Sequence, residues 1–203
     1  MQHYYHLPHM GEDWFTYPRL YDHVVDKFDS GLFIEVGSWK GKSAAYLGVN
    51  IINSGKNIKL HCVDTFGGSI EHTGVKEIVE GTLHATCVQN LEPVSSVVEI
   101  FKIDSVSASK NYEDKSIEFV FIDGDHSYEA VMEDIAAWLP KVKPGGILAG
   151  HDYGWHDPIK KAVADSFGPG DYSDIWNCGC WILDIDDQGN PIKRPNTFRY
   201  TVG

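Results

Sequence analysis

The sequence predicts an α/β fold in which a mostly parallel β-sheet carries helices on both faces. Short apolar runs alternate along the chain with longer segments of helical periodicity, which is the pattern of repeated strand–helix units. A glycine-containing turn joins the first apolar run to a helical segment, and an aspartate stands at or just after the end of each of the next four strands. Both features place polar groups beyond the carboxyl ends of the strands, where open α/β sheets bind ligands.

The predicted elements follow from apolar periodicity and from turn residues. Strands are expected at residues 32–36, 58–63, 97–103, 117–122, 147–149 and 180–185, with a further short one at 198–202. Helices are expected at residues 17–28, 43–52, 127–139 and 157–167. Pro18 and Pro158 fit the first turns of two of these helices, since proline is favoured there.

Two segments between the predicted elements contain several glycines. Lys143–Gly146 (Lys-Pro-Gly-Gly) predicts a turn before the fifth strand. Residues 66–86 contain four glycines, which interrupt any helix. A segment of that length is either a lid over a functional site or a tolerated insertion.

The length and composition indicate a single globular domain. With 203 residues, 42% hydrophobic, the chain is long enough for one sizeable core. We expect an N-terminal extension with the first helix at residues 1–30, the main domain at 31–186 and a tail at 187–203.

The net charge of −12 argues against a nucleic-acid-binding protein and against a polybasic membrane anchor. No apolar run has the length of a membrane span, and the first residues show no secretory signal. The four cysteines form no C-x-x-C motif. A cytoplasmic protein with reduced cysteines is therefore expected.

The most informative turn is Glu-Val-Gly-Ser-Trp-Lys-Gly-Lys-Ser at residues 35–43. Gly37 and Gly41 let the backbone approach a ligand where a Cβ would collide, and free N–H groups at the helix start can meet polar ligand atoms. Three residues separate the glycines, whereas a phosphate-binding P-loop needs four, and Trp39 excludes the dinucleotide pattern G-x-G-x-x-G. A structural turn without a ligand is the alternative.

Two of the aspartates at strand ends suggest nucleoside contacts. Asp64 lies 23 residues after Gly41, near the interval at which an acid meets ribose hydroxyls in dinucleotide folds. Its two carboxylate oxygens can accept both O–H groups. Asp104 could equally cap the helix that follows it.

A candidate general base follows the fourth strand. His126 lies three residues after Asp123, and histidine is the usual residue type for taking a hydroxyl proton near neutral pH. The alternative is that His126 caps the next helix or bonds to Asp123.

Three ordered motifs resemble those of class I S-adenosylmethionine (SAM)-dependent methyltransferases. They are E-x-G-x-x-x-G-x-S at residues 35–43, Asp-Thr-Phe-Gly-Gly-Ser at 64–69, and Phe-Ile-Asp-Gly-Asp-His-Ser-Tyr at 121–128 with Pro-Gly-Gly-Ile-Leu-Ala-Gly-His-Asp-Tyr at 144–153. The resemblance covers roughly residues 30–185 and is to a bacterial and phage group of small-molecule or sugar O-methyltransferases. It implies a Rossmann-like, seven-stranded, mostly parallel sheet, and methyl transfer from SAM to a hydroxyl of a sugar or phenol-like small molecule.

The resemblance also implies the residues of the site. The expected cofactor-binding residues are Glu35, Gly37, Ser38, Gly41, Ser43, Asp64, Thr65, Asp104, Ser105 and Asp123. His126 and Asp123 are the expected catalytic residues.

A divalent metal, Mg²⁺ or Mn²⁺, is expected at Asp123, His151 and Asp152. Tips of neighbouring parallel strands lie about 5 Å apart, and two carboxylates so close repel each other unless a cation or a shared proton relieves them. The chain departs from catechol-type enzymes at Tyr153, where those enzymes have asparagine.

Two other functions stay open from the sequence. One is a non-catalytic SAM- or nucleoside-binding module, and the other is a metal-independent N-methyltransferase. The expected partner is a small-molecule substrate rather than nucleic acid or membrane. A homo-oligomer is also open, and the substrate itself cannot be read from the residues.

Overall fold

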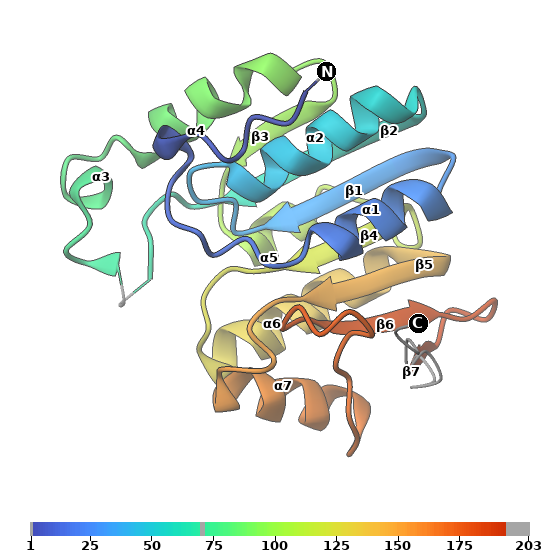
Figure 1. The fold of residues 1–203 in the computed structure, drawn as a ribbon. Helices are drawn as coiled ribbons and strands as arrows, with labels where there is room; N and C mark the ends of the chain where they lie inside the picture. The colour runs from blue at the N-terminus through green and yellow to red at the C-terminus, as the bar shows by residue number, and fades with distance from the viewer. Residues whose placement is uncertain (1, 70–71, 194–203) are drawn as a thin grey trace, which may run out of the picture.

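The computed structural model describes residues 2–69 and 72–193. At its centre lies one seven-stranded sheet with the strand order β3-β2-β1-β4-β5-β6-β7 (Figure 1). Strands β1 to β5 pair in parallel, whereas β6 runs antiparallel to β5 and β7 antiparallel to β6. The seven-stranded, mostly parallel sheet expected from the sequence is confirmed.

The elements have the following bounds. The strands are β1 Ser30–Val36, β2 Asn57–Asp64, β3 Val98–Lys102, β4 Ile117–Ile122, β5 Val142–Gly150, β6 Trp181–Ile185 and β7 Pro191–Lys193. The helices are α1 Pro18–Lys27, α2 Lys42–Ser54, α3 Lys76–Val79, α4 Leu83–Leu91, α5 Ser105–Ser109, α6 Tyr128–Trp138 and α7 Asp157–Phe167.

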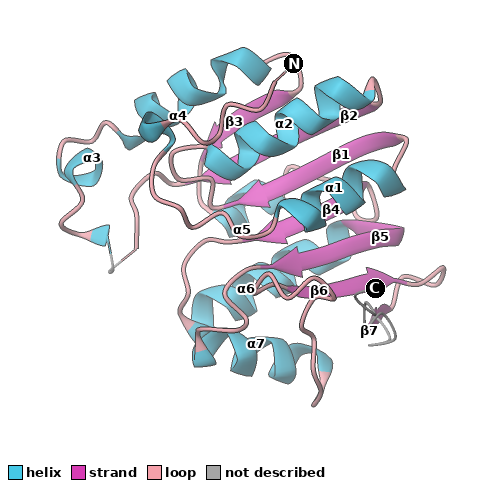
Figure 2. Cartoon of the chain, viewed as in Figure 1, coloured by secondary structure: helices cyan, strands magenta, loops and turns pink. Residues whose placement is uncertain are grey.

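Both faces of the sheet are covered, so its inner strands are apolar on both sides. In β4, Phe119 and Phe121 belong to one core cluster, while Val120 and Ile122 belong to the other, as the two-residue period of a strand requires. Helices α1, α2 and α4 contribute to the first cluster, and α5, α6 and α7 to the second (Figure 2). The alternation of strands and helices in the sequence therefore becomes a three-layer fold.

The predicted helices match α1, α2, α6 and α7 to within two residues at each end. Pro18 and Pro158 lie in the first turns of α1 and α7. Most predicted strands match equally well, but β5 is much longer than the expected 147–149.

Three local expectations need correction. Residues 143–146 form no separate turn but lie inside β5, where the pairing register with β4 shifts between Ile117 and Phe119. The glycine-interrupted segment 66–86 contains the short helix α3 and the start of α4. Strand β7 lies in the segment expected to be irregular, and the predicted strand at 198–202 lies outside the described residues.

The N-terminal segment reaches the edge of the sheet that matters for ligands. It runs past the carboxyl ends of the central strands before α1 begins (Figure 1). Ion pairs hold it there: Lys40 Nζ lies 3.5 Å from Glu12 and 2.9 Å from Glu77 of α3, and Lys42 Nζ lies 3.1 Å from Asp13.

No helix in the described part of the chain combines the length and the apolar character needed to cross a membrane.

Candidate cofactor and acceptor site

A cavity of about 810 Å³ lies at the carboxyl edge of the sheet. This volume is in the range of small-molecule and cofactor pockets. Most of the residues expected to form the site line it: Gly37, Ser38, Ser43, Asp64, Thr65, Asp104, Ser105, Asp123, His126, His151 and Asp152. Glu35 and Gly41 are not among its lining residues.

The two glycines of the β1–α2 turn are fixed by contacts within the protein. Gly37 has φ +84°, and a Cβ there would lie 2.0 Å from the carbonyl oxygen of Asp123. Gly41 has φ +86°, and a Cβ there would lie 2.9 Å from Leu91 Cγ. Close approach of a ligand is therefore not the reason for these glycines, and the sequence-based argument is corrected on this point.

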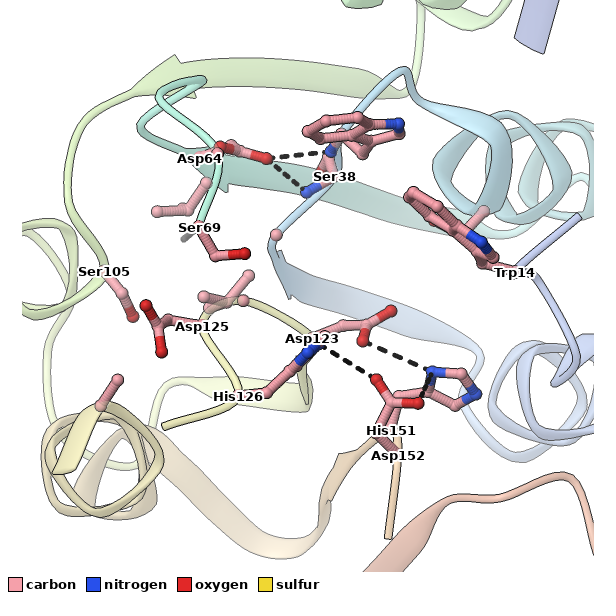
Figure 3. A pocket seen from close by; sticks show the side chains of 18 of the residues that line it. Trp14, Ser38, Asp64, Ser69, Ser105, Asp123, Asp125, His126, His151 and Asp152 are labelled. Carbon is pink, nitrogen blue, oxygen red and sulfur yellow. Dashed lines mark hydrogen bonds and ion pairs between the residues drawn. The ribbon is translucent and has the colours of Figure 1, made fainter. Parts of the chain in front are cut away.

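Asp64, at the end of β2, holds the same turn in place. Its Oδ2 accepts hydrogen bonds from the backbone N–H groups of Ser38 and Trp39, both at 2.9 Å, and its Oδ1 accepts one from Phe66 at 2.6 Å (Figure 3). Burial raises the pKa of this carboxyl, against the effect of the three backbone hydrogen bonds. A carboxylate can accept about four hydrogen bonds, so Asp64 has about one acceptor position left for the ribose, whereas the sequence analysis expected it to accept from both ribose hydroxyls.

Glu35 lies behind the turn and is fully buried. It accepts hydrogen bonds from Tyr21 Oη at 2.7 Å and from Ser38 Oγ at 2.8 Å. Burial raises the pKa of this carboxyl to about 7, although the hydrogen bonds from Tyr21, Ser43 and Ser38 oppose the shift. Its position makes Glu35 a support for the turn and for α1.

The predicted metal ligands converge at the ends of β4 and β5. His151 Nδ1 lies 3.5 Å from Asp123 Oδ1 and 3.5 Å from Asp152 Oδ1, so this one ring nitrogen faces both carboxylates (Figure 3). These three side chains form a group whose ligand atoms lie close enough to hold one metal ion. Asp152 has φ +59°, a strained backbone angle for a residue with a Cβ.

The outer side of the His151 ring is fixed by Thr16. Thr16 Oγ1 donates to the carbonyl oxygen of Cys178 at 2.7 Å and lies 2.9 Å from His151 Nε2. Since the single hydroxyl proton is used on Cys178, Nε2 carries a proton and donates to Thr16. Nδ1 is then left to face the carboxylates, either as an N–H donor or as a lone pair for a metal ion.

Without a metal ion, a protonated His151 offsets one of the two negative charges of Asp123 and Asp152. Burial opposes its charge, but Asp123 and Asp152 outweigh that effect and raise the pKa of the His151 ring to about 10. In turn, burial opposes ionisation of Asp152, but His126 and His151 hold the pKa of this carboxyl well below its usual range.

His126 does not cap α6 and lies beside Asp152. Ser127 is the N-cap of α6, and His126 Nε2 lies 3.0 Å from Asp152 Oδ2. The Nδ1 atom of His126 is buried, so Nε2 is the ring nitrogen nearer the cavity. The ring of His156, the N-cap residue of α7, lies beside it, with the centroids 4.9 Å apart and the planes tilted by 35°.

Asp104 does cap a helix, which was one of its two expected roles. Its side chain accepts a hydrogen bond from Ser107 N at 2.8 Å at the start of α5. The neighbouring Ser105 Oγ accepts from Trp138 Nε1 at 2.8 Å. Asp104 and Ser105 also line the cavity, beside the apolar side chains of Ile103 and Val106.

The N-terminal segment supplies further residues of the cavity wall, among them Tyr17, which the sequence analysis missed as a site residue. Tyr17 Oη donates to Asp123 Oδ2 at 2.8 Å, and burial together with Asp123 raises the pKa of this phenol well above its usual value. Trp14 is half exposed at the mouth of the cavity, with its ring 5.8 Å from that of Trp39 and 5.7 Å from that of His72. His156 was also missed, although its spacing of four residues from Asp152 was a readable signal.

Carboxylates dominate the wall of the cavity. Nine acidic residues line it: Glu12, Asp13, Asp64, Asp104, Asp123, Asp125, Glu133, Asp134 and Asp152. Among the described lining residues, Lys42 is the only lysine or arginine, and its ammonium group is paired with Asp13. The cavity therefore has a negative electrostatic potential.

The family of the chain follows from comparison with known proteins. A family model described as a methyltransferase domain matches residues 34–153, which is more than half of the chain. The chain belongs to this methyltransferase family. As a SAM-dependent methyltransferase, it has the enzyme class and the cofactor expected from the sequence motifs.

A curated relative and several solved structures are similar to this methyltransferase. An uncharacterized protein of Acanthamoeba polyphaga mimivirus is 26% identical over 156 residues, which are 71% of this chain and 66% of the relative, just under two thirds of its length. The O-methyltransferase NovP superposes with a TM-score of 0.58 at 17% identity, over 82% of this chain and 78% of NovP.

Two further structures share the fold. A Corynebacterium glutamicum protein has a TM-score of 0.58 at 14% identity, over 83% of this chain and 80% of its own. A candidate rRNA methylase from Clostridium thermocellum has a TM-score of 0.58 at 15% identity, over 86% of this chain and 96% of its own. At these identities the likeness establishes the Rossmann-like fold and leaves the substrate open.

Proposed function

We propose that this methyltransferase transfers the methyl group of SAM to a hydroxyl of a neutral or cationic small molecule. The observation that carries the proposal is the cluster of Asp123, His126, His151 and Asp152 in the wall of the cavity, beside the β1–α2 turn. NovP, which shares the fold, is named as an O-methyltransferase.

The residues of the cavity fit SAM. Ile103 and Val106 offer apolar contacts to a purine, and Asp104 and Ser105 offer polar ones at its edge. The remaining acceptor position of Asp64 suits one ribose hydroxyl. The negative potential suits the positively charged sulfonium and amino groups of SAM, which when bound supplies an electrophilic methyl group.

The fit to a divalent cation is also good. Asp123, His151 and Asp152 would hold it, because both Oδ1 atoms and Nδ1 face one point and Thr16 fixes the proton on the other ring nitrogen. A bound divalent cation supplies a Lewis acid that lowers the pKa of a neighbouring hydroxyl. The donor set of two carboxylates and one imidazole suits Mn²⁺, and Mg²⁺ less well.

His126 would act as the general base. In the described conformation Nε2 lies 3.0 Å from the Asp152 carboxylate, so the ring would have to turn away from Asp152 for Nε2 to take the proton of the acceptor hydroxyl. Tyr17 orients Asp123 through its hydrogen bond to Oδ2. Most of the rate gain would come from holding the hydroxyl and the methyl group in line.

The charge of the cavity restricts the acceptor. A phosphorylated or nucleic-acid acceptor would bring negative charge toward nine carboxylates and one paired lysine, so a sugar, phenol or amine-containing molecule fits better. The half-exposed Trp14 at the cavity mouth offers a flat apolar surface for such a ring.

Metal-independent transfer is a second candidate, and it has one specific observation in its favour. His151 can offset one of the two negative charges of Asp123 and Asp152 without a metal ion, because its Nδ1 faces both carboxylates. An acceptor that needs no Lewis acid, such as an amine, would then be methylated at the same place.

The test is a methyl-transfer assay with labelled SAM against neutral sugars, phenols, amines and a short RNA, each with and without chelator. We expect transfer to a neutral or cationic hydroxyl compound that falls in chelator and in Asp123→Asn. Full activity in chelator would favour the metal-independent candidate. Transfer to RNA alone would contradict the proposed acceptor, and SAM binding without transfer to any class would favour a binding module.

A further inference from the structure

A second group of possible metal ligands lies beside the one expected from the sequence. His126, Asp152 and His156 each offer one ligand atom, and these three atoms lie within 4.8 Å of one another. His126 comes from the loop between β4 and α6, and the other two come from the loop between β5 and α7. All three residues line the cavity.

The local backbone brings the two residues of the second loop together. The N–H groups of Trp155 and His156 both donate to the carbonyl oxygen of Asp152, at 3.1 and 3.0 Å, which closes a turn. Asp152 sits in this turn at φ +59°, a conformation that side-chain-bearing residues adopt at a cost. The carboxylate of Asp152 lies beside the ring of His126, and the ring of His156 is next to that of His126.

The donor atoms of this group differ from those of the first. Two imidazoles and one carboxylate favour Zn²⁺, Co²⁺ or Ni²⁺ over Mg²⁺, which prefers oxygen ligands. Ligand atoms about 2.1 Å from a tetrahedral metal lie roughly 3.4 Å apart, close to the 3.0 Å that separates His126 Nε2 from Asp152 Oδ2. Small side-chain movements would therefore complete three ligands and leave the fourth position facing the cavity.

The two groups share Asp152 through different oxygens. Oδ1 faces His151 of the first group at 3.5 Å, and Oδ2 faces His126 of the second at 3.0 Å. A metal ion bound by the second group occupies His126 Nε2, the atom that would otherwise take the acceptor proton.

We propose that His126, Asp152 and His156 form a binding site for a late divalent transition metal, and that occupation of this site inhibits methyl transfer. The binding part stands on the geometry alone. The inhibitory part rests on the proposed function, since it depends on His126 acting as the base.

The binding part is tested with Co²⁺ on the untagged full chain, by following its visible absorption during titration. We expect one Co²⁺ with imidazole nitrogen ligands, displaced by Zn²⁺, and His156→Ala should weaken binding by at least about 10-fold, the least that loss of a ligand contact costs. Asp123→Asn should keep this site, because Asp123 belongs only to the first group. His84→Ala, which changes a histidine outside the cavity, is the matched control. Equal Co²⁺ affinity in the wild type and His156→Ala, or loss in Asp123→Asn but not in His156→Ala, would overturn the site.

The inhibitory part is tested by the ratio of turnover with and without Zn²⁺ at saturating Mg²⁺ or Mn²⁺. We expect Zn²⁺ to reduce wild-type turnover by about 10²–10⁴-fold, the effect of losing a general base, and to leave the ratio for His156→Ala near one. Wild-type turnover that persists with the site loaded contradicts inhibition. If the protein transfers no methyl group at all, the proposed function fails, while the Co²⁺ titration still decides whether the site exists.

Discussion

Replacing the buried Glu35 by glutamine should change how the stability of the protein depends on pH. In the folded state burial raises the pKa of this carboxyl to about 7, from an ordinary value of 4.5. The folded protein therefore keeps a proton that the unfolded chain releases between these two pH values. The free energy of unfolding must fall as the pH rises through this window and level off above pH 7.

The size of the effect follows from the two pKa values. One pKa unit corresponds to about 1.4 kcal/mol, so ionised Glu35 costs the folded state about 3 kcal/mol at high pH. Between pH 5 and pH 8 the free energy of unfolding falls by about 2–3 kcal/mol, because Glu35 of the unfolded chain is already partly ionised at pH 5. Glutamine cannot ionise, so the unfolding free energy of Glu35→Gln does not show this fall with pH. A change in the hydrogen bonds to Tyr21 and Ser38 would shift its stability equally at both pH values.

The assay is urea unfolding of the wild type and Glu35→Gln at pH 5 and pH 8. The difference in unfolding free energy between the two proteins should move by about 2–3 kcal/mol in favour of the variant as the pH rises. Glu129→Gln, which removes an exposed carboxylate from α6, controls for the change in net charge. A difference that stays constant between the two pH values would refute the reasoning.

Three further predictions concern the turn and the chemistry. Gly37→Ala should lower the free energy of unfolding by more than the roughly 1–2 kcal/mol cost of a left-handed backbone, because the new Cβ meets the backbone of Asp123. Gly41→Ala should lower it less, because its new Cβ meets the side chain of Leu91. Urea unfolding of both variants checks which of the two is the less stable. Asp64→Ala should lower the free energy of unfolding and weaken the binding of SAM, each by about 1–3 kcal/mol. Calorimetry measures both quantities, and weaker SAM binding with unchanged stability would mean that Asp64 contacts the ligand but does not stabilise the turn. His126→Ala should lower turnover by about 10²–10⁴-fold, with a deficit that shrinks as the pH rises, and unchanged turnover would remove it as the base.

The architecture could be predicted because it depends on local patterns. The strands of the sheet centre are buried on both faces, so they stand out as apolar runs, and α1 and α7 are marked by prolines in their first turns. Helix α4 and strand β7 were missed, because glycines precede the first and the second has only three residues in a polar tail.

The site was predictable where its residues stand in sequence motifs and unpredictable where they come from remote segments. Asp123, His126, His151 and Asp152 follow strand ends, and the order of the sheet brings those ends together. Thr16 and Tyr17 carry no such signal, since they meet His151 and Asp123 from positions 135 and 106 residues away. The hydrogen bonds that Asp64 accepts from the turn and the internal contacts of Gly37 could not be predicted, because they involve backbone N–H and carbonyl groups that the sequence does not place.

The hydrogen bonds of Thr16 have a consequence for the order in which the site is built. The hydroxyl of this residue donates to the backbone of Cys178, which is synthesised 162 residues later. Domains begin to fold during synthesis, and contacts between residues distant in the chain form late because the closure of a long loop must be offset first. The wall of the cavity next to His151 can therefore close only after Cys178 has been synthesised. A nascent chain that already has strands β1 to β5 would still lack this contact, so the sheet can form before the wall of its cavity is complete.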